Sequence, residues 1–136
     1  MPYPVLEIDF NRNPELADNI WNAQRAHHPA VLTYGGPAIS PGNRQEAMHY
    51  EDPNGISQEI MRILSRDEYP FACTLEGGKS PWVGHIPGKE NSSQGGLISA
   101  FLRKYMILPT TATAPQKEQE KSKFEVRVTN HPRGPV

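Results

Sequence analysis

The densest group of reactive side chains in the sequence is Arg66-Asp67-Glu68, which is followed by the segment Tyr69-Pro70-Phe71. Two neighbouring carboxylates stand beside an arginine just before an expected strand, and a proline restricts the backbone next to them. An aspartate at the entry of a strand can act as a general base or as a ligand of a divalent metal. The alternative interpretation is a salt-bridged turn with buried aromatic side chains.

A second polar segment, residues 89–96 (KENSSQGG), leads into an expected helix. Backbone N–H groups at the start of a helix can hold a phosphate group. Glu90 and Asn91 add hard oxygen donors of the kind that Mg²⁺ or Mn²⁺ prefers. The alternative is a capped helix start that binds no ligand. His85 is a further candidate base near both segments, because an imidazole titrates near neutral pH.

Hydrophobic periodicity and turn residues predict the elements that position these groups. Strands are expected at 5–10 and 30–34, and helices at 14–26, 43–50 and 56–64. Two strands, Phe71–Leu75 and Trp82–Ile86, are expected to form a hairpin, and a loop over 87–96 then precedes a helix at 97–107. Residues 109–123 carry no large apolar side chain and predict a flexible loop. An edge strand at 124–128 and a frayed end at 130–136 complete the prediction.

The order strand, strand, helix is typical of ββα-metal nucleases. In that layout, an acid or histidine on the first strand and an asparagine or acid on the helix face one divalent ion. The ion neutralises the phosphate and stabilises the leaving oxygen, while a base activates water.

Composition limits the classes of protein that fit. The 136 residues and 15.2 kDa predict a single domain, 1–136, with its core at about 3–107 plus the strand 124–128. The 14 prolines and 11 glycines favour a loop-rich α+β fold over a helical bundle. One cysteine, Cys73, excludes an internal disulfide and a multi-cysteine zinc site.

Neither a membrane span nor a signal peptide is visible in the sequence. Residues 1–60 carry three basic against eight acidic side chains, and residues 61–136 carry eleven against seven. An anionic partner is therefore expected to approach the second half of the chain.

Several segments in fixed order resemble the NucA/NucB-type deoxyribonuclease family. They are RDEYPFA at 66–72, EGG at 76–78, IP at 86–87, EN at 90–91 and QGG at 94–96. The likeness covers roughly 4–107, and 124–128 matches the family's final strand. The ordered set is far more specific than any one segment.

The resemblance implies a small mixed sheet with flanking helices and a ββα-metal-like hairpin-plus-helix core. It also implies a metal-dependent, non-specific endonuclease that hydrolyses DNA and uses Mg²⁺ or Mn²⁺. In this family an aspartate replaces the usual histidine base, which implies that role for Asp67. The resemblance further implies metal or phosphate positioning by Glu90 and Asn91, and phosphate contact by Arg66. The remaining matched residues are the acids Glu68 and Glu76, expected to be catalytic, and Lys89, Ser93 and Gln94, expected to bind phosphate.

Three departures and three alternatives accompany this hypothesis. The chain shows no secretion signal, carries the 109–123 insertion, and has an apolar helix after Gly96. A monomer is expected that is secreted or exported by a segment outside this chain, and a cytosolic location stays open. The alternatives are a toxin module neutralised by an immunity protein or other inhibitor, a catalytically inactive nucleic-acid-binding module, and a ribonuclease.

Overall fold

The strand β5 (Lys123–Thr129) organises the first of two sheets. The computed structural model describes residues 2–48 and 64–136. In it β5 pairs in parallel with β1 (Val5–Asp9) and antiparallel with β2 (Val31–Thr33). β5 is thus the middle strand, and the prediction of an edge strand was wrong. The alternation of apolar and polar residues in β5 indicates that Phe124, Val126 and Val128 are buried on one face. It does not indicate which edges of the strand are paired.

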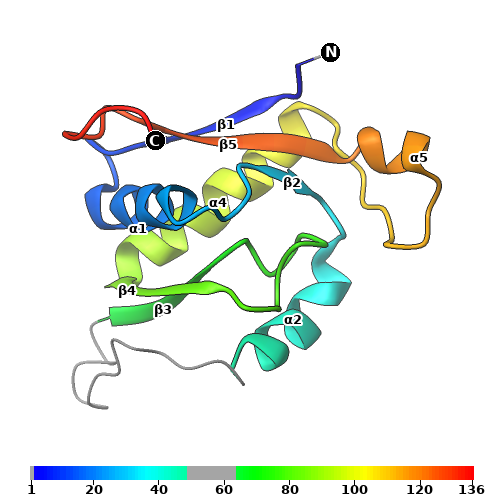
Figure 1. The fold of residues 1–136 in the computed structure, drawn as a ribbon, viewed down its shortest axis with the longest axis horizontal. Helices are drawn as coiled ribbons and strands as arrows, with labels where there is room; N and C mark the ends of the chain where they lie inside the picture. Colours follow the sequence, from blue (N-terminus) through cyan, green and yellow to red (C-terminus); the bar gives the residue numbers. More distant parts are fainter. Residues whose placement is uncertain (1, 49–63) are drawn as a thin grey trace.

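The helix α1 (Pro14–Arg25) lies between the two sheets (Figure 1). It starts with a proline at the first helical position, where the missing N–H costs nothing. It contacts β1 and β5 of one sheet, and both strands of the second sheet, β3 (Leu64–Tyr69) and β4 (Trp82–Pro87). Its buried side chains, Leu16, Ala17, Asn19, Ile20, Trp21 and Ala23, therefore serve the core and the second sheet together.

The second sheet is the antiparallel pair of β3 and β4, with Asp67 opposite Gly84. The predicted strand at 71–75 was wrong, because the strand ends at Tyr69. Pro70 has no N–H to extend the ladder, and the chain turns where the Thr74 N–H and hydroxyl both donate to the carbonyl of Phe71. The helix predicted over 56–64 falls outside the described residues except for Leu64, which begins β3.

The helix α4 (Gly88–Lys104) follows β4 directly. The predicted loop at 87–96 was therefore wrong, and the helix starts nine residues before the predicted Leu97. Glycines cost roughly 1 kcal/mol each in a helix interior. Packing outweighs that cost here, because Gln94, Phe101 and Leu102 are buried along one side of α4.

Two further short helices lie in the part of the chain that the structure describes. α2 (Ser40–Ala47) follows a 3₁₀ turn at Pro37–Ile39 and begins before the predicted position. α5 (Gln116–Glu120) lies within the expected loop 109–123. Hydrogen bonds hold that loop in place of apolar burial, since the Gln119 amide donates to three carbonyls of residues 111–114.

The C-terminal tail is anchored, and the prediction of a frayed end was wrong. His131 is buried and stacks on Trp21, whose indole N–H donates to the carbonyl of Gly134 at 2.8 Å. The mixture of helices and two small sheets confirms the α+β class. Within the described residues, no helix has the length and apolar character needed to cross a membrane.

Candidate active site

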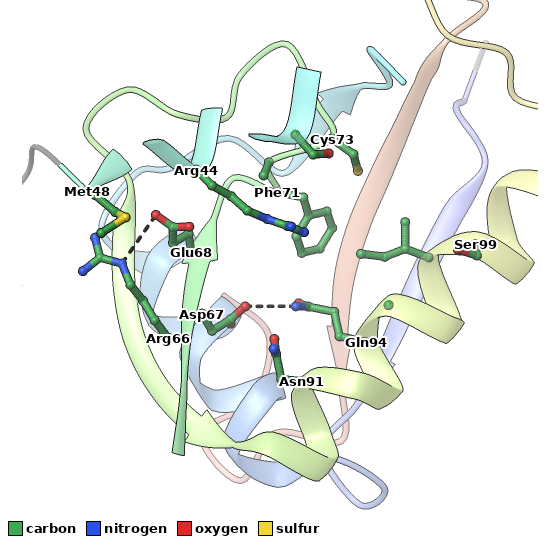
Figure 2. Close-up of a pocket in the computed structure, with 14 residues that line it drawn as sticks. Arg44, Met48, Arg66, Asp67, Glu68, Phe71, Cys73, Asn91, Gln94 and Ser99 are labelled. Carbon is green, nitrogen blue, oxygen red and sulfur yellow. Dashed lines mark hydrogen bonds and ion pairs between the residues drawn. The ribbon is translucent and has the colours of Figure 1, made fainter. Parts of the chain in front are cut away.

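A cavity of about 570 Å³ opens between α2, β3 and α4 (Figure 2). It follows the edge of β3 that is unpaired among the described strands, since the other edge pairs with β4. Side chains from both faces of an edge strand can reach such a cavity, because successive residues alternate between faces. The lining residues are Ser40, Arg44, Met48, Arg66, Asp67, Glu68, Phe71, Ala72, Cys73, Asn91, Gln94, Gly95, Ile98 and Ser99.

Asp67 lies at the base of this cavity and is only 2% exposed. Its Oδ1 accepts a hydrogen bond from Gln94 Nε2 at 2.9 Å, and its Oδ2 accepts one from Asn19 Nδ2 at 2.8 Å. Burial raises the pKa of Asp67, and the two amide donors oppose that effect. A buried carboxylate with a raised pKa is a stronger proton acceptor than an exposed one.

Arg66 and Glu68 lie two residues apart and share the opposite face of β3. Arg66 Nε lies 3.5 Å from Glu68 Oε2, and Arg66 Nη2 donates to the Ala47 carbonyl at 3.1 Å. Burial raises the pKa of Glu68, and the charge of Arg66 acts against it. The arginine is therefore tied to the end of α2 while its charge faces the cavity.

α4 supplies two amides to the same cavity. Asn91 and Gln94 are three residues apart, which places them on one helix face, and both extend toward Asp67 (Figure 2). Gln94 is 8% exposed, and its Oε1 has no hydrogen-bond partner among the described residues. A buried amide oxygen left in this state is a candidate ligand atom.

Arg44 is a cavity residue that the sequence did not reveal. It is an exposed residue of α2, and its guanidinium reaches into the cavity toward Phe71 (Figure 2). The position of α2 is fixed by Asn43, whose Nδ2 donates to the carbonyls of Ala72 at 2.8 Å and Thr74 at 3.1 Å. No local signal distinguishes this arginine from a solvated one.

Asn19 is a second residue that sequence reasoning missed, although a signal was present. It is buried on the apolar side of α1 beside Leu16 and Ile20. An amide at a helical position otherwise reserved for apolar side chains requires a polar partner. That partner is Asp67, 48 residues further along the chain.

Four of the predicted site residues lie elsewhere. Glu76 accepts from the Thr33 N–H at 2.7 Å and from the Thr33 hydroxyl at 2.8 Å. Lys89 is exposed on the first turn of α4. Ser93 lines a separate polar cavity beside β1.

The fourth residue is Glu90. Its Oε1 accepts from the backbone N–H groups of Glu15 at 3.0 Å and Leu16 at 3.1 Å, so it caps the start of α1. The roles first expected for Glu90, Glu76, Lys89 and Ser93 stay predictions.

The oxygen atoms of the cavity suit a hard cation. The structure describes no cluster of three or more His, Cys, Asp and Glu side chains arranged to hold a metal. Mg²⁺, however, commonly uses one or two carboxylates and completes its shell with water and substrate phosphate. The Glu68 carboxylate, the Asn91 amide and the unpartnered Gln94 Oε1 line one cavity and are candidate oxygen donors of this kind, with Glu68 on the opposite face of β3 from the two amides.

A protein-family model matches the sequence. The family model described as "Deoxyribonuclease NucA/NucB" covers residues 20–113, more than half of the chain. No curated protein matches the sequence. The matched range contains every residue that lines the cavity, while Asn19 lies just before it.

Proposed function

The chain belongs to the NucA/NucB deoxyribonuclease family, and we propose that it is a metal-dependent, non-specific endonuclease that hydrolyses DNA. The observation that carries the proposal is a single open cavity in which the Asp67 carboxylate, two amides of α4 and two arginines converge. A buried base, oxygen ligands and cations are what hydrolysis of a phosphodiester requires.

Asp67 is the proposed general base. A water molecule gives its proton to Asp67 as its oxygen forms a bond to phosphorus, and the bond from phosphorus to the leaving sugar oxygen breaks. The leaving oxygen takes a proton from solvent. Asp67 is suited to this step because burial raises its pKa, while the amides of Asn19 and Gln94 hold both of its oxygens.

Arg44 and Arg66 are the proposed phosphate-binding residues. Guanidinium groups form strong, charge-assisted hydrogen bonds with phosphate oxygens. Arg66 is held by Glu68 and by the Ala47 carbonyl, so its charge is already in place before substrate arrives. Charge that builds on the phosphate during attack is stabilised most by groups fixed in advance.

Glu68, Asn91 and the Oε1 atom of Gln94 are the residues proposed to hold Mg²⁺ or Mn²⁺. When bound, the ion neutralises phosphate charge and stabilises the leaving oxygen. Gln94 would then have two duties, since its Nε2 donates to Asp67 while its oxygen is unpartnered in the described structure.

Degradation of plasmid DNA, with and without EDTA, tests the proposal. The wild-type protein is expected to cleave in Mg²⁺ or Mn²⁺ and to stop on chelation, and Asp67→Asn is expected to be inactive. Asp18→Asn, which changes a half-exposed carboxylate on α1, is the matched control and retains activity. Undiminished cleavage by Asp67→Asn overturns the assignment of the base.

Three further experiments separate the other functions. Parallel reactions on RNA measure whether the protein prefers deoxyribose or ribose in the nucleic-acid backbone. DNA binding without turnover at any metal concentration favours an inactive binding module. Toxicity in a bacterial host that a neighbouring gene product relieves points to a toxin with an immunity protein.

A further inference from the structure

Asn19 joins the candidate active site to an aromatic residue outside the cavity. Its Oδ1 accepts a hydrogen bond from the indole N–H of Trp82 at 3.0 Å, and its Nδ2 donates to Asp67 Oδ2 at 2.8 Å. Asn19 is 9% exposed; its bond to Asp67 is buried, and its bond to Trp82 is partly buried. The chain of contacts therefore runs from β4 through α1 to β3.

The indole fixes which way the Asn19 amide points. An indole N–H can only donate a hydrogen bond, so the oxygen of Asn19 must face Trp82 and its NH₂ group must face Asp67. Gln94 differs, because its Oε1 has no hydrogen-bond partner among the described residues. Of the two amides that donate to Asp67, only that of Asn19 has its orientation fixed by a further hydrogen bond among the described residues.

Gly84 makes room for this arrangement. It lies opposite Asp67 in the register of β3 and β4. A Cβ atom at Gly84 would stand 2.0 Å from Asn19 Oδ1 and 2.9 Å from Asn19 Nδ2, closer than non-bonded atoms can approach. The Asn19 side chain thus passes over β4 at Gly84, where the absence of a Cβ leaves space for its amide to reach Asp67.

We propose that Trp82 and Asn19 are positioning residues that hold the Asp67 carboxylate in the orientation needed to take a proton from water. Catalytic bases are commonly oriented by a third group in this way. The inference rests on the proposed function, because it assigns these residues to the base named there. Neither residue needs to touch the substrate.

A double-mutant cycle tests the proposal, with kcat and KM measured for cleavage of a DNA substrate. Asn19→Ala is expected to lower kcat about 10–100-fold with KM nearly unchanged, because a small misplacement of a catalytic group has effects of this size. Trp82→Phe keeps a smaller aromatic ring at this position but removes the N–H donor, and is expected to lower kcat about 3–10-fold. In the Asn19→Ala background, Trp82→Phe is expected to have no further effect, because coupled residues are not additive.

Trp21→Phe is the matched control. It removes another indole hydrogen bond, that to the Gly134 carbonyl at 2.8 Å, and neither Trp21 nor Gly134 lines the cavity. It is expected to lower the urea midpoint without changing kcat. If Asn19→Ala does not fold, Asn19→Ser retains a small donor and replaces it in the cycle.

Two results overturn the proposal: a wild-type kcat in Trp82→Phe, or losses of kcat that add fully in the double variant. The Asp67→Asn variant separates this failure from that of the proposed function. If Asp67→Asn stays active, the general base itself is wrong. If Asp67→Asn is inactive and the cycle shows no coupling, Asp67 remains the base and the positioning role alone fails.

Discussion

Replacing Asp67 by asparagine should separate catalysis from folding. Removal of a general base lowers the rate about 10²–10⁴-fold, which corresponds to about 3–5 kcal/mol in the activation barrier. Asparagine has nearly the shape of aspartate but cannot take a proton from water. The loss is expected in kcat, since Asp67 is buried beneath the cavity and its own contacts are to Asn19 and Gln94.

The same substitution should leave the fold intact. Trp82 fixes Asn19 as a donor, so the carbonyl of an asparagine at position 67 would face Asn19. Its NH₂ group would face Gln94, whose unpartnered Oε1 can turn to accept it. Gln94 Nε2 then takes the buried place that Oε1 held, so one atom of this amide is without a partner among the described residues, as in the wild type. In Asp67→Ala both amide donors lose their acceptor, and at about 1–3 kcal/mol each this costs about 2–6 kcal/mol of stability.

The pH dependence of stability follows from the raised pKa of Asp67. The folded protein binds this proton more tightly than the unfolded chain, whose carboxyl has a pKa near 3.8. As pH rises from that value through the folded-state pKa, the free energy of unfolding therefore falls, and above it the loss is complete. Asp67→Asn removes this loss, so it should equal or exceed the wild type in stability at neutral pH.

Two measurements check these predictions for Asp67→Asn. Urea denaturation followed by tryptophan fluorescence measures its stability, and initial rates of plasmid cleavage measure its loss of activity. The stability advantage of Asp67→Asn should shrink as the buffer is made acidic, because the wild-type carboxyl is then protonated as well. An unfolded Asp67→Asn variant, or one that cleaves DNA at close to the wild-type rate, refutes the reasoning.

Four further outcomes are expected. Glu76→Ala should lower the free energy of unfolding by about 1–3 kcal/mol in urea titrations, because this carboxylate holds Thr33, and kcat of the same variant tests the catalytic role expected from the sequence. Glu90→Ala should cost about 0.5–2 kcal/mol by the same measurement, as for loss of a helix cap. Arg44→Ala should weaken DNA binding and reduce its logarithmic salt slope by about one, whereas the control Arg103→Ala should not. The acidic limb of the kcat/KM profile should lie above the ordinary carboxyl pKa, because burial raises the pKa of Asp67 and the base must be ionised.

The sequence predicted the core elements well because their signals are local. β1 and α1 follow from alternation and from the proline at a helix start. β3 was misplaced because its residues, LSRDEY, bring charge to the cavity and lack the apolar pattern of a strand. The neighbouring segment 71–75 has that pattern but forms a turn. A strand that carries charged residues into a cavity lacks the apolar pattern on which strand prediction depends.

The start of α4 was missed for a related reason. Its first turns are polar and glycine-containing because they face the cavity and solvent: a Cβ at Gly95 or Gly96 would have nothing within 4 Å. Of the site, Asp67, Arg66, Glu68, Asn91 and Gln94 were named from motifs in sequence and all line the cavity. Asn19 and Arg44 come from distant segments and required the fold.

The capping role of Glu90 gives the site a closed set of contacts. Glu90 and Gln94 are four residues apart on α4, so they lie on neighbouring turns of one face. Glu90 of α4 accepts a hydrogen bond from the start of α1, and Asn19 of α1 donates one to Asp67 of β3. Asp67 in turn accepts a hydrogen bond from Gln94, which lies on α4. A shift of any one of α1, β3 and α4 therefore breaks two of these three links. Because α1 also packs on the three-stranded sheet, the orientation of Asp67 is coupled to the stability of the whole fold, although no residue of β1, β2 or β5 lines the cavity.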